Sequence, residues 1–222
     1  MGSQASPMTA DGEVAVLGWV KQHRRATTVA ASVLALVAAG AWFAWTARSR
    51  RESFAARALQ GARSSAEAGN LPLAASDLSR LVSSYGGTVS GDEASLLLAQ
   101  VRLLQNQAPL AVADLKKFVA SAPHDQFRGP GQQLLGSALE QLGQAADAGR
   151  AYEAAAAGFT YRPIRAQSLN DAGRAYWLAA DTARAATAYE RVVREFSDQP
   201  SALEAKIRLS ELRRSPPSPA KR

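Results

Sequence analysis

The stretch AGRAYWLAADTARAATAYERVVREFSDQP, residues 172–200, decides the fold of this chain. Alanine, arginine and glutamate dominate it, which is typical of helices. Pro200 marks the end of the second helix. Gly173 is small, whereas Tyr189 and Val192 are large. A small residue lets two helices approach closely, and a large residue on the facing helix fills the gap. The stretch therefore predicts two helices joined by a short turn.

The same pattern recurs along the chain with a spacing of 37 residues. When the four copies are aligned, three equivalent positions stand out. They are an alanine, a large residue four positions after it, and a small residue twelve positions before it. The alanines are Ala74, Ala111, Ala148 and Ala185; the large residues are Leu78, Leu115, Tyr152 and Tyr189; the small residues are Ala62, Ala99, Gly136 and Gly173. A single helix pair cannot bury its own apolar face, so repeated pairs are expected to stack into a solenoid.

The pattern resembles the tetratricopeptide repeat, and AGRAY (172–176) with ATAYERVVREFSDQP (186–200) carries the resemblance best. It implies an all-α, right-handed α-solenoid of about four helix pairs plus a capping helix. A transmembrane helix is expected before these repeats, on the separate grounds given below. The first unit is degenerate, since Gly86-Gly87 replaces the usual proline. The expected repeat domain spans 52–214, with units at about 55–91, 92–128, 129–165 and 166–201 and a cap at 202–214.

An apolar run precedes the repeats. Residues 26–47, ATTVAASVLALVAAGAWFAWTA, carry no charge, and a bilayer core needs about 20 helical residues. The aromatic residues Trp42, Phe43 and Trp45 cluster at one end, where such rings favour the membrane interface. The run therefore predicts a transmembrane anchor. A cleaved signal peptide is the alternative, although its apolar region is usually shorter. Basic residues flank both ends, so charge alone leaves the orientation open.

The net charge of +7 lies mostly outside the repeats. Residues 1–51 hold an excess of four positive charges, the last eight residues add two, and residues 52–214 contribute one. A nucleic-acid-binding domain is expected to carry a basic stripe on its folded part, so nucleic acid is not an expected partner. Residues 1–25 are expected to form a cytoplasmic tail with a short amphipathic helix at 13–20, and residues 215–222 a disordered tail.

The sequence contains few residues of the kinds that form catalytic or metal-binding sites. It has no cysteine, which excludes disulfides and a lipid-modified cysteine, and its two histidines, His23 and His124, are far apart. The acidic residues are spread along the expected helices beside basic ones, as on solvated faces. No catalytic residue, metal site, cofactor or small-molecule substrate is therefore expected, and the chain is not predicted to be an enzyme.

Binding residues are expected on the first helix of each pair, because those helices line the concave side of a stacked array. Asn170 and Arg174, one turn apart, are candidates to hold a peptide carboxylate, with Trp177 beside them. The loop residues Tyr161, Arg162 and Pro163 form a second candidate patch. The full set of groove positions is Arg63, Gln100, Gln133, Ser137, Asn170, Arg174 and Trp177.

The overall layout is similar to that of the tetratricopeptide-repeat ancillary subunit of the bacterial Sec translocon, over roughly residues 13–210. That resemblance implies a single-pass inner-membrane protein with a cytoplasmic N-terminus and periplasmic repeats. The implied partners are proteins: translocon or envelope-assembly subunits, chaperones or client peptides. The alternative function is a soluble secreted or periplasmic adaptor, released by signal cleavage, that acts in outer-membrane or envelope assembly.

Overall fold

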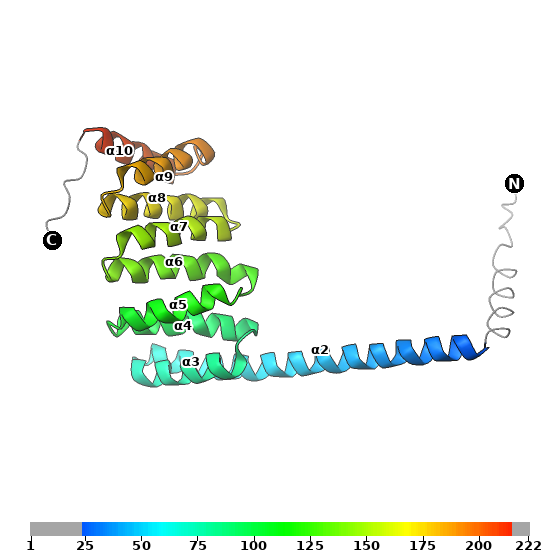
Figure 1. The fold of residues 1–222 in the computed structure, drawn as a ribbon. Helices are drawn as coiled ribbons and strands as arrows, with labels where there is room; N and C mark the ends of the chain where they lie inside the picture. Colours follow the sequence, from blue (N-terminus) through cyan, green and yellow to red (C-terminus); the bar gives the residue numbers. More distant parts are fainter. Residues whose placement is uncertain (1–23, 215–222) are drawn as a thin grey trace, which may run out of the picture. The chain divides into compact units, whose positions relative to one another are not determined.

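The structure, a computed structural model, describes residues 24–214, and every regular element among them is a helix (Figure 1). The predicted all-α fold is thus confirmed over this part of the chain. The helices are α2 (Arg24–Glu67), α3 (Leu71–Tyr85), α4 (Val89–Leu104), α5 (Ala108–Ala120), α6 (Asp125–Gln141), α7 (Ala145–Gly158), α8 (Arg162–Leu178), α9 (Thr182–Glu195) and α10 (Ser201–Arg214). The chain divides into two compact units, residues 1–50 and 51–222.

In the first unit, the part of α2 up to residue 50 confirms the helix expected at 26–47. Its large apolar side chains are exposed, among them Leu34, Leu36, Trp42 and Phe43. Over the residues whose side chains the structure describes, which omit 24, 26, 27, 30 and 31, no helix is both long and apolar enough to cross a membrane. The anchor is therefore not confirmed. Of the tail expected at 1–25, residues 1–23 lie outside the described residues, as does the tail expected at 215–222, whereas residues 24 and 25 belong to α2.

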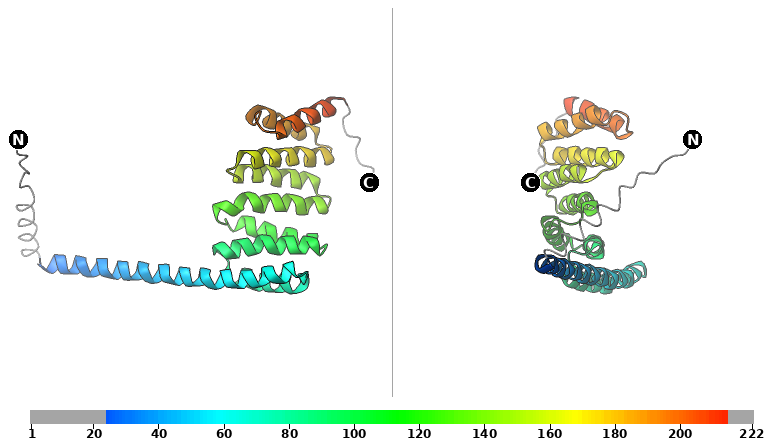
Figure 2. Two further views of the ribbon diagram at one scale, coloured as in Figure 1. Left: turned by 180° about the vertical axis from the view of Figure 1, so that it is seen from behind. Right: turned by 90° about the vertical axis from the view of Figure 1, so that its right-hand side faces the viewer.

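In the second unit, α3 to α10 stack in chain order as antiparallel neighbours (Figures 1 and 2). Each helix packs on the next, and two longer-range pairs, α4 with α6 and α8 with α10, join first helices of successive pairs. The C-terminal part of α2 packs with α3 through Leu59, Ala62, Ala74 and Leu78. The predicted solenoid of helix pairs is confirmed.

The small and large columns of the sequence meet in the structure. A Cβ built at Gly136 would lie 2.5 Å from Cε1 of Tyr152, and one at Gly173 would lie 2.6 Å from Cε1 of Tyr189. Glycine is therefore the residue that allows a tyrosine ring to fill the space between the two helices of a pair. The same device joins successive pairs, since Gly149 lies under the ring of Tyr176.

The turns inside the pairs share one geometry at the 37-residue spacing. The first helices end at residues with positive φ: Gly69, Asn106, Gly143 and Ala180. In the last of these turns the N–H of Ala180 donates to the Trp177 carbonyl, and the N–H of Asp181 to the Tyr176 carbonyl, both at 2.9 Å. This Schellman-type end satisfies the last carbonyls of the helix and fixes the direction of the next one.

The buried side chains form two clusters that meet at α4. The smaller cluster joins α2, α3 and α4 through residues such as Leu59, Leu78 and Leu98. The larger one begins at Ala99, on another side of α4, and continues to Ala205 in α10. The repeat domain is therefore continuous in its backbone but divided in its core.

Candidate functional site

The seven predicted groove residues lie on the first helices α2, α4, α6 and α8, where their spacing placed them. Gln100 is exposed on α4. Arg63 on α2 is paired with Glu93 of α4, which neutralises its charge within the chain. Of these two positions, Gln100 is the one that keeps an accessible polar group without such a pairing.

Gln133 and Ser137 on α6 make contacts within the repeat array. The Nε2 of Gln133 donates to Oδ2 of Asp171 at 2.9 Å, and its Oε1 accepts from the Ser168 hydroxyl at 2.8 Å. The Ser137 hydroxyl lies 3.3 Å from that of Tyr152. These bonds use the side chain of Gln133 to join α6 to α8.

Asn170 does not lie on an accessible surface. Its side chain is 2% exposed, and its Nδ2 donates to the Ser201 carbonyl at 2.9 Å and to Oε2 of Glu204 at 3.3 Å. The following first helix, α10, therefore covers it. Because the residues that cover Asn170 lie more than thirty positions later in the sequence, the helical spacing around Asn170 gave no sign of its burial.

Arg174 is held by carboxylates of its own chain. Its two terminal nitrogens bond the Glu140 oxygens at 2.7 and 3.2 Å, and Asp171 lies 3.5 Å away. Burial disfavours the charged form of Arg174, but the hydrogen bonds that its guanidinium donates to Glu140 outweigh burial and raise the pKa of the guanidinium. A bidentate pair of this kind is strong and geometrically fixed. The carboxylate clamp expected from Asn170 and Arg174 is therefore not formed: one residue is buried and the other is paired.

Glu140 also links this pair to the core. The hydroxyl of Tyr152 donates to Oε2 of Glu140 at 2.9 Å. Burial raises the pKa of Tyr152 to about 12, and the negative charge of Glu140 adds to the effect. The polar cluster of Gln133, Glu140, Asp171 and Arg174 thus braces α6 against α8.

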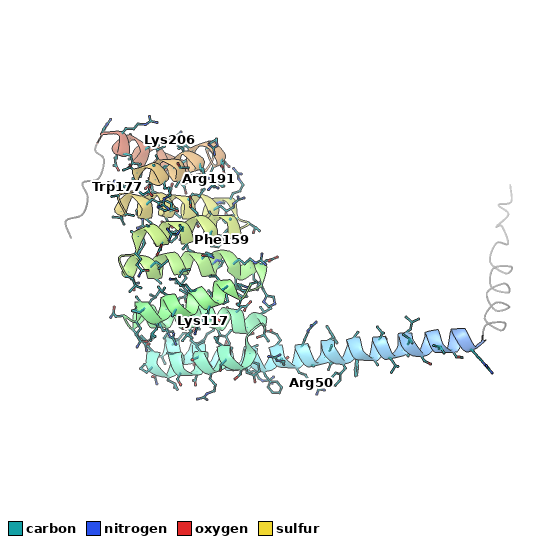
Figure 3. The ribbon with its side chains drawn as sticks, in the orientation of Figure 1. Arg50, Lys117, Phe159, Trp177, Arg191 and Lys206 are labelled. Atoms are coloured by element: carbon teal, nitrogen blue, oxygen red, sulfur yellow. The ribbon has the colours of Figure 1, made fainter. Side chains whose placement is uncertain are left out.

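Trp177 lies on α8 (Figure 3) and packs against the larger core cluster. Its indole N–H is buried and has no hydrogen-bond acceptor among the residues that the structure describes. At least one side of the ring therefore packs on the core. The buried N–H without an acceptor lowers the stability of the fold. Partner binding by the seven groove residues stays a prediction.

Two exposed leucines on first helices of the array were not among the binding residues predicted from the sequence. Leu104 is 69% exposed at the end of α4, and Leu178 is 60% exposed at the end of α8. They occupy equivalent positions two repeats apart, with the exposed Gln141 between them. The 37-residue register could have identified this row, because it places all three at one point of the repeat.

In the second candidate patch, residues 161–163, one side chain is already bound within the chain and another is exposed. Tyr161 is 64% exposed before α8, whereas Arg162 donates to Asp198 at 2.9 Å and lies over the ring of Phe196. A cavity of about 990 Å³ opens nearby, between the turn that joins α5 to α6 and the end of α7, and Phe159 and Arg128 are among its lining residues. Among residues 24–214 there is no cluster of three or more potential metal ligands.

A family profile described as tetratricopeptide repeat-like domain matches residues 18–214 of this chain. The chain belongs to this family. Stacked tetratricopeptide helix pairs thus account for both the 37-residue register and the observed packing. No curated protein matches the chain.

Solved tetratricopeptide structures show the same fold. The nearly identical repeats of a kinesin light chain-like protein from Podosopora anserina are 22% identical, with a TM-score of 0.56 over 72% of this chain and 85% of theirs. The MamA protein is 20% identical, with a TM-score of 0.52 over 71% of this chain and 85% of its own. At these identities the likeness extends to the fold alone. A tetratricopeptide array is typically a non-enzymatic scaffold that binds proteins.

Proposed function

We propose that this protein is a membrane-tethered scaffold of the bacterial cell envelope, whose tetratricopeptide array binds a protein partner along its first helices. The observation that supports this most is the accessible row on α4, α6 and α8, which carries the exposed Leu104, Gln141 and Leu178. Arrays of stacked helix pairs offer this side as an extended concave binding surface.

The contacts in the array also suggest the chemistry of the partner. Since Arg63 and Arg174 are paired with acids of the chain and Asn170 is buried, the row is not strongly charged. Leu104 and Leu178 favour apolar side chains, and Gln100 can exchange hydrogen bonds with a peptide backbone. The partner is therefore an extended or helical segment with apolar anchors.

The tether rests on residues 26–47. Their 22 residues carry no charge, and the large apolar side chains described there, such as Leu34 and Trp42, are exposed. So much exposed apolar surface on one helix marks a contact with lipid or with another protein. Trp42, Phe43 and Trp45 lie at one end of the run, as interfacial anchors do.

We place the repeats in the periplasm and the N-terminus in the cytoplasm. The layout that resembles the ancillary translocon subunit supports this placement, with translocon subunits or periplasmic chaperones as partners. A photo-crosslinker at Gln100 in intact membranes tests it, with the exposed Lys116 of α5 as the matched control position. Position 100 should yield translocon or chaperone subunits and position 116 should not. Consistent absence of both partner classes at position 100 contradicts the proposed partners.

Membrane tethering needs its own experiment. The full chain should stay in the membrane fraction after alkaline extraction, whereas Leu34→Arg with Val37→Arg should release it, because two charges at the centre of the run oppose insertion. Mass spectrometry of the mature N-terminus completes the test. Loss of residues 1–47 would identify the protein as a released adaptor and overturn the tether.

A further inference from the structure

The last helix, α10, continues the repeat register beyond the fourth pair. Ser210 follows Gly173 at the same 37-residue spacing, so the column of small residues extends from Ala62 to Ser210. In each preceding pair this column lies on the first helix. Helix α10 is therefore the first helix of a further pair.

One face of α10 is packed as in the other first helices. Ala202 and Ala205 are 2% and 0% exposed and belong to the larger core cluster, and Leu209 and Leu212 pack against it. Asn170 of α8 bonds the start of α10 through Ser201 and Glu204. This face holds α10 on α8 and α9.

The opposite face is apolar and uncovered. Leu203 is 66% exposed and Ile207 is 50% exposed, one helical turn apart. Their counterparts one repeat earlier, Ala166 and Asn170, are 0% and 2% exposed, and Asn170 is covered by the later helix α10. The counterpart of Ser210, Gly173, lies under the ring of Tyr189 from the second helix of its pair. Ser210 therefore lies where the second helix of a pair packs elsewhere in the array. Ile207 lies beside it, at the position where the next first helix covers Asn170.

The sequence that follows predicts no such second helix. Residues 215–222, SPPSPAKR, contain three prolines, and proline interrupts a helix. The helix that would cover Leu203 and Ile207 is therefore not expected from these eight residues.

The charges around this face indicate what kind of helix fits. Lys206, Arg213 and Arg214 are exposed on α10 (Lys206 is labelled in Figure 3). Arg208 is paired with Glu211 at 2.9 Å, and the exposed Glu204 accepts a hydrogen bond from Asn170 at 3.3 Å, so basic side chains exceed acidic ones on this helix. A second copy of α10 would bring these basic side chains together, which is unfavourable. An acidic helix would meet opposite charge around an apolar centre.

We propose that α10 docks an acidic amphipathic helix of a partner protein, which completes a fifth helix pair. The repeat register defines its apolar positions: a small residue, a large one four positions later and another apolar one three further, as Ala185, Tyr189 and Val192 in α9. This second binding surface lies at the end of the array and is separate from the row on α4, α6 and α8. It does not depend on the membrane tether.

A synthetic peptide tests the proposal directly. The probe is residues 182–195 with Arg184, Arg191 and Arg194 replaced by Glu, with blocked ends and a fluorophore. Its binding to the purified full chain in nonionic detergent is followed by fluorescence anisotropy. Leu203→Ser with Ile207→Ser should weaken binding about tenfold or more, because the apolar centre is lost. The matched control, Leu73→Ser with Leu110→Ser, removes leucines of similar exposure from α3 and α5 and should bind as the unmodified chain does.

Three further outcomes separate the alternatives. The unmodified 182–195 peptide, which keeps its arginines, should bind more weakly than the acidic probe; equal binding overturns the acidic partner. Unchanged binding by the Leu203/Ile207 variant overturns the site. A full chain that dimerises in sedimentation and becomes monomeric with Ile207→Glu shows that a second copy occupies the face, which also overturns the proposal.

Crosslinking then checks the geometry. The chain has no cysteine, so Ser210→Cys introduces a single thiol. It should form a disulfide with a probe that carries cysteine at the tyrosine position, because Gly173 and Tyr189 meet in that way. Lys116→Cys on α5 should not react. Equal reaction at both positions contradicts the docking register, whatever the result of the crosslinker at Gln100.

Discussion

Glycine at position 136 leaves the space that the ring of Tyr152 occupies. An added Cβ would lie 2.5 Å from Cε1 and 2.7 Å from Cδ1 of that ring, closer than real Cβ atoms approach. The ring is buried between α6 and α7 and has little room to move. Gly136→Ala should therefore lower the free energy of unfolding by about 1–3 kcal/mol. Urea unfolding followed by circular dichroism measures the change.

Gly61 provides the matched control for this substitution. It also lies inside a helix, α2, but a Cβ there meets nothing within 4 Å. Gly61→Ala should raise the free energy of unfolding by about 0.5–1 kcal/mol, because alanine favours the helix. Equal effects of the two substitutions would show that helix propensity, not the tyrosine contact, governs position 136.

Ala180 occupies a backbone position that favours glycine. Its φ is +59°, and the equivalent turns hold Gly69, Asn106 and Gly143. The left-handed conformation strains a residue with a Cβ. Ala180→Gly should raise the free energy of unfolding by about 0.5 kcal/mol, because relief of the backbone strain outweighs the added freedom of the unfolded chain. The thermal midpoint should therefore rise. Ala179→Gly, at φ −79°, should lower it. A lowered midpoint for both would contradict the strain.

Glu52 joins two helices that are far apart in sequence. Its Oε2 accepts the N–H of Val89 and its Oε1 the N–H of Ser90, both at 2.9 Å, at the start of α4. Burial opposes ionisation, but the bonds from Ser90 and Val89 outweigh it and lower the pKa of Glu52. Glu52→Ala should destabilise the contact of α2 with α4 by about 1 kcal/mol. Hydrogen exchange at the first turn of α4 should increase.

The sign of the pH effect follows from the lowered pKa. The bonds of the ionised Glu52 contribute stability above the ordinary carboxyl pKa, and that contribution is lost as the pH falls through the lower folded-state value. Protection of the α4 start should therefore fall on acidification in the unmodified chain and change less in Glu52→Ala. Thr88, which caps the Gly91 N–H at 3.0 Å, does not titrate in this range and serves as the control through Thr88→Ala. Equal acid sensitivity of all three proteins would exclude Glu52 as the cause.

At the level of helix pairs, the sequence allowed more prediction than at the level of the binding row. Small and large residues at a fixed spacing predicted that Gly173 meets Tyr189, because that contact is local to one pair. The burial of Asn170 and the ion pair of Arg174 could not be predicted in the same way. Asn170 is covered by α10, and Arg174 is paired with Glu140 from the previous pair. Such contacts depend on how pairs stack, and polar groups on a helix can face either solvent or the next unit.

Across the whole repeat domain, the division of the core decides how stability is distributed. Repeat arrays gain stability from each unit and from each interface with a neighbour, so a weak interface lets one end open separately. Helix α4 faces both core clusters, with Leu98 in the smaller and Ala99 in the larger. The α2–α3 end should therefore open at lower denaturant concentration than α5 to α10.

Two leucines at equivalent repeat positions test this division. Leu78 in α3 and Leu115 in α5 are both 0% exposed, but Leu78 belongs to the smaller cluster and Leu115 to the larger. Replacing either with alanine removes the same buried atoms, at a cost of about 2–5 kcal/mol. Leu78→Ala should speed hydrogen exchange in residues 51–104 and leave α6 to α10 protected, whereas Leu115→Ala should speed exchange from α5 onward. If both substitutions loosen the same helices to the same extent, the array unfolds as one cooperative unit and the division of the core has no energetic consequence.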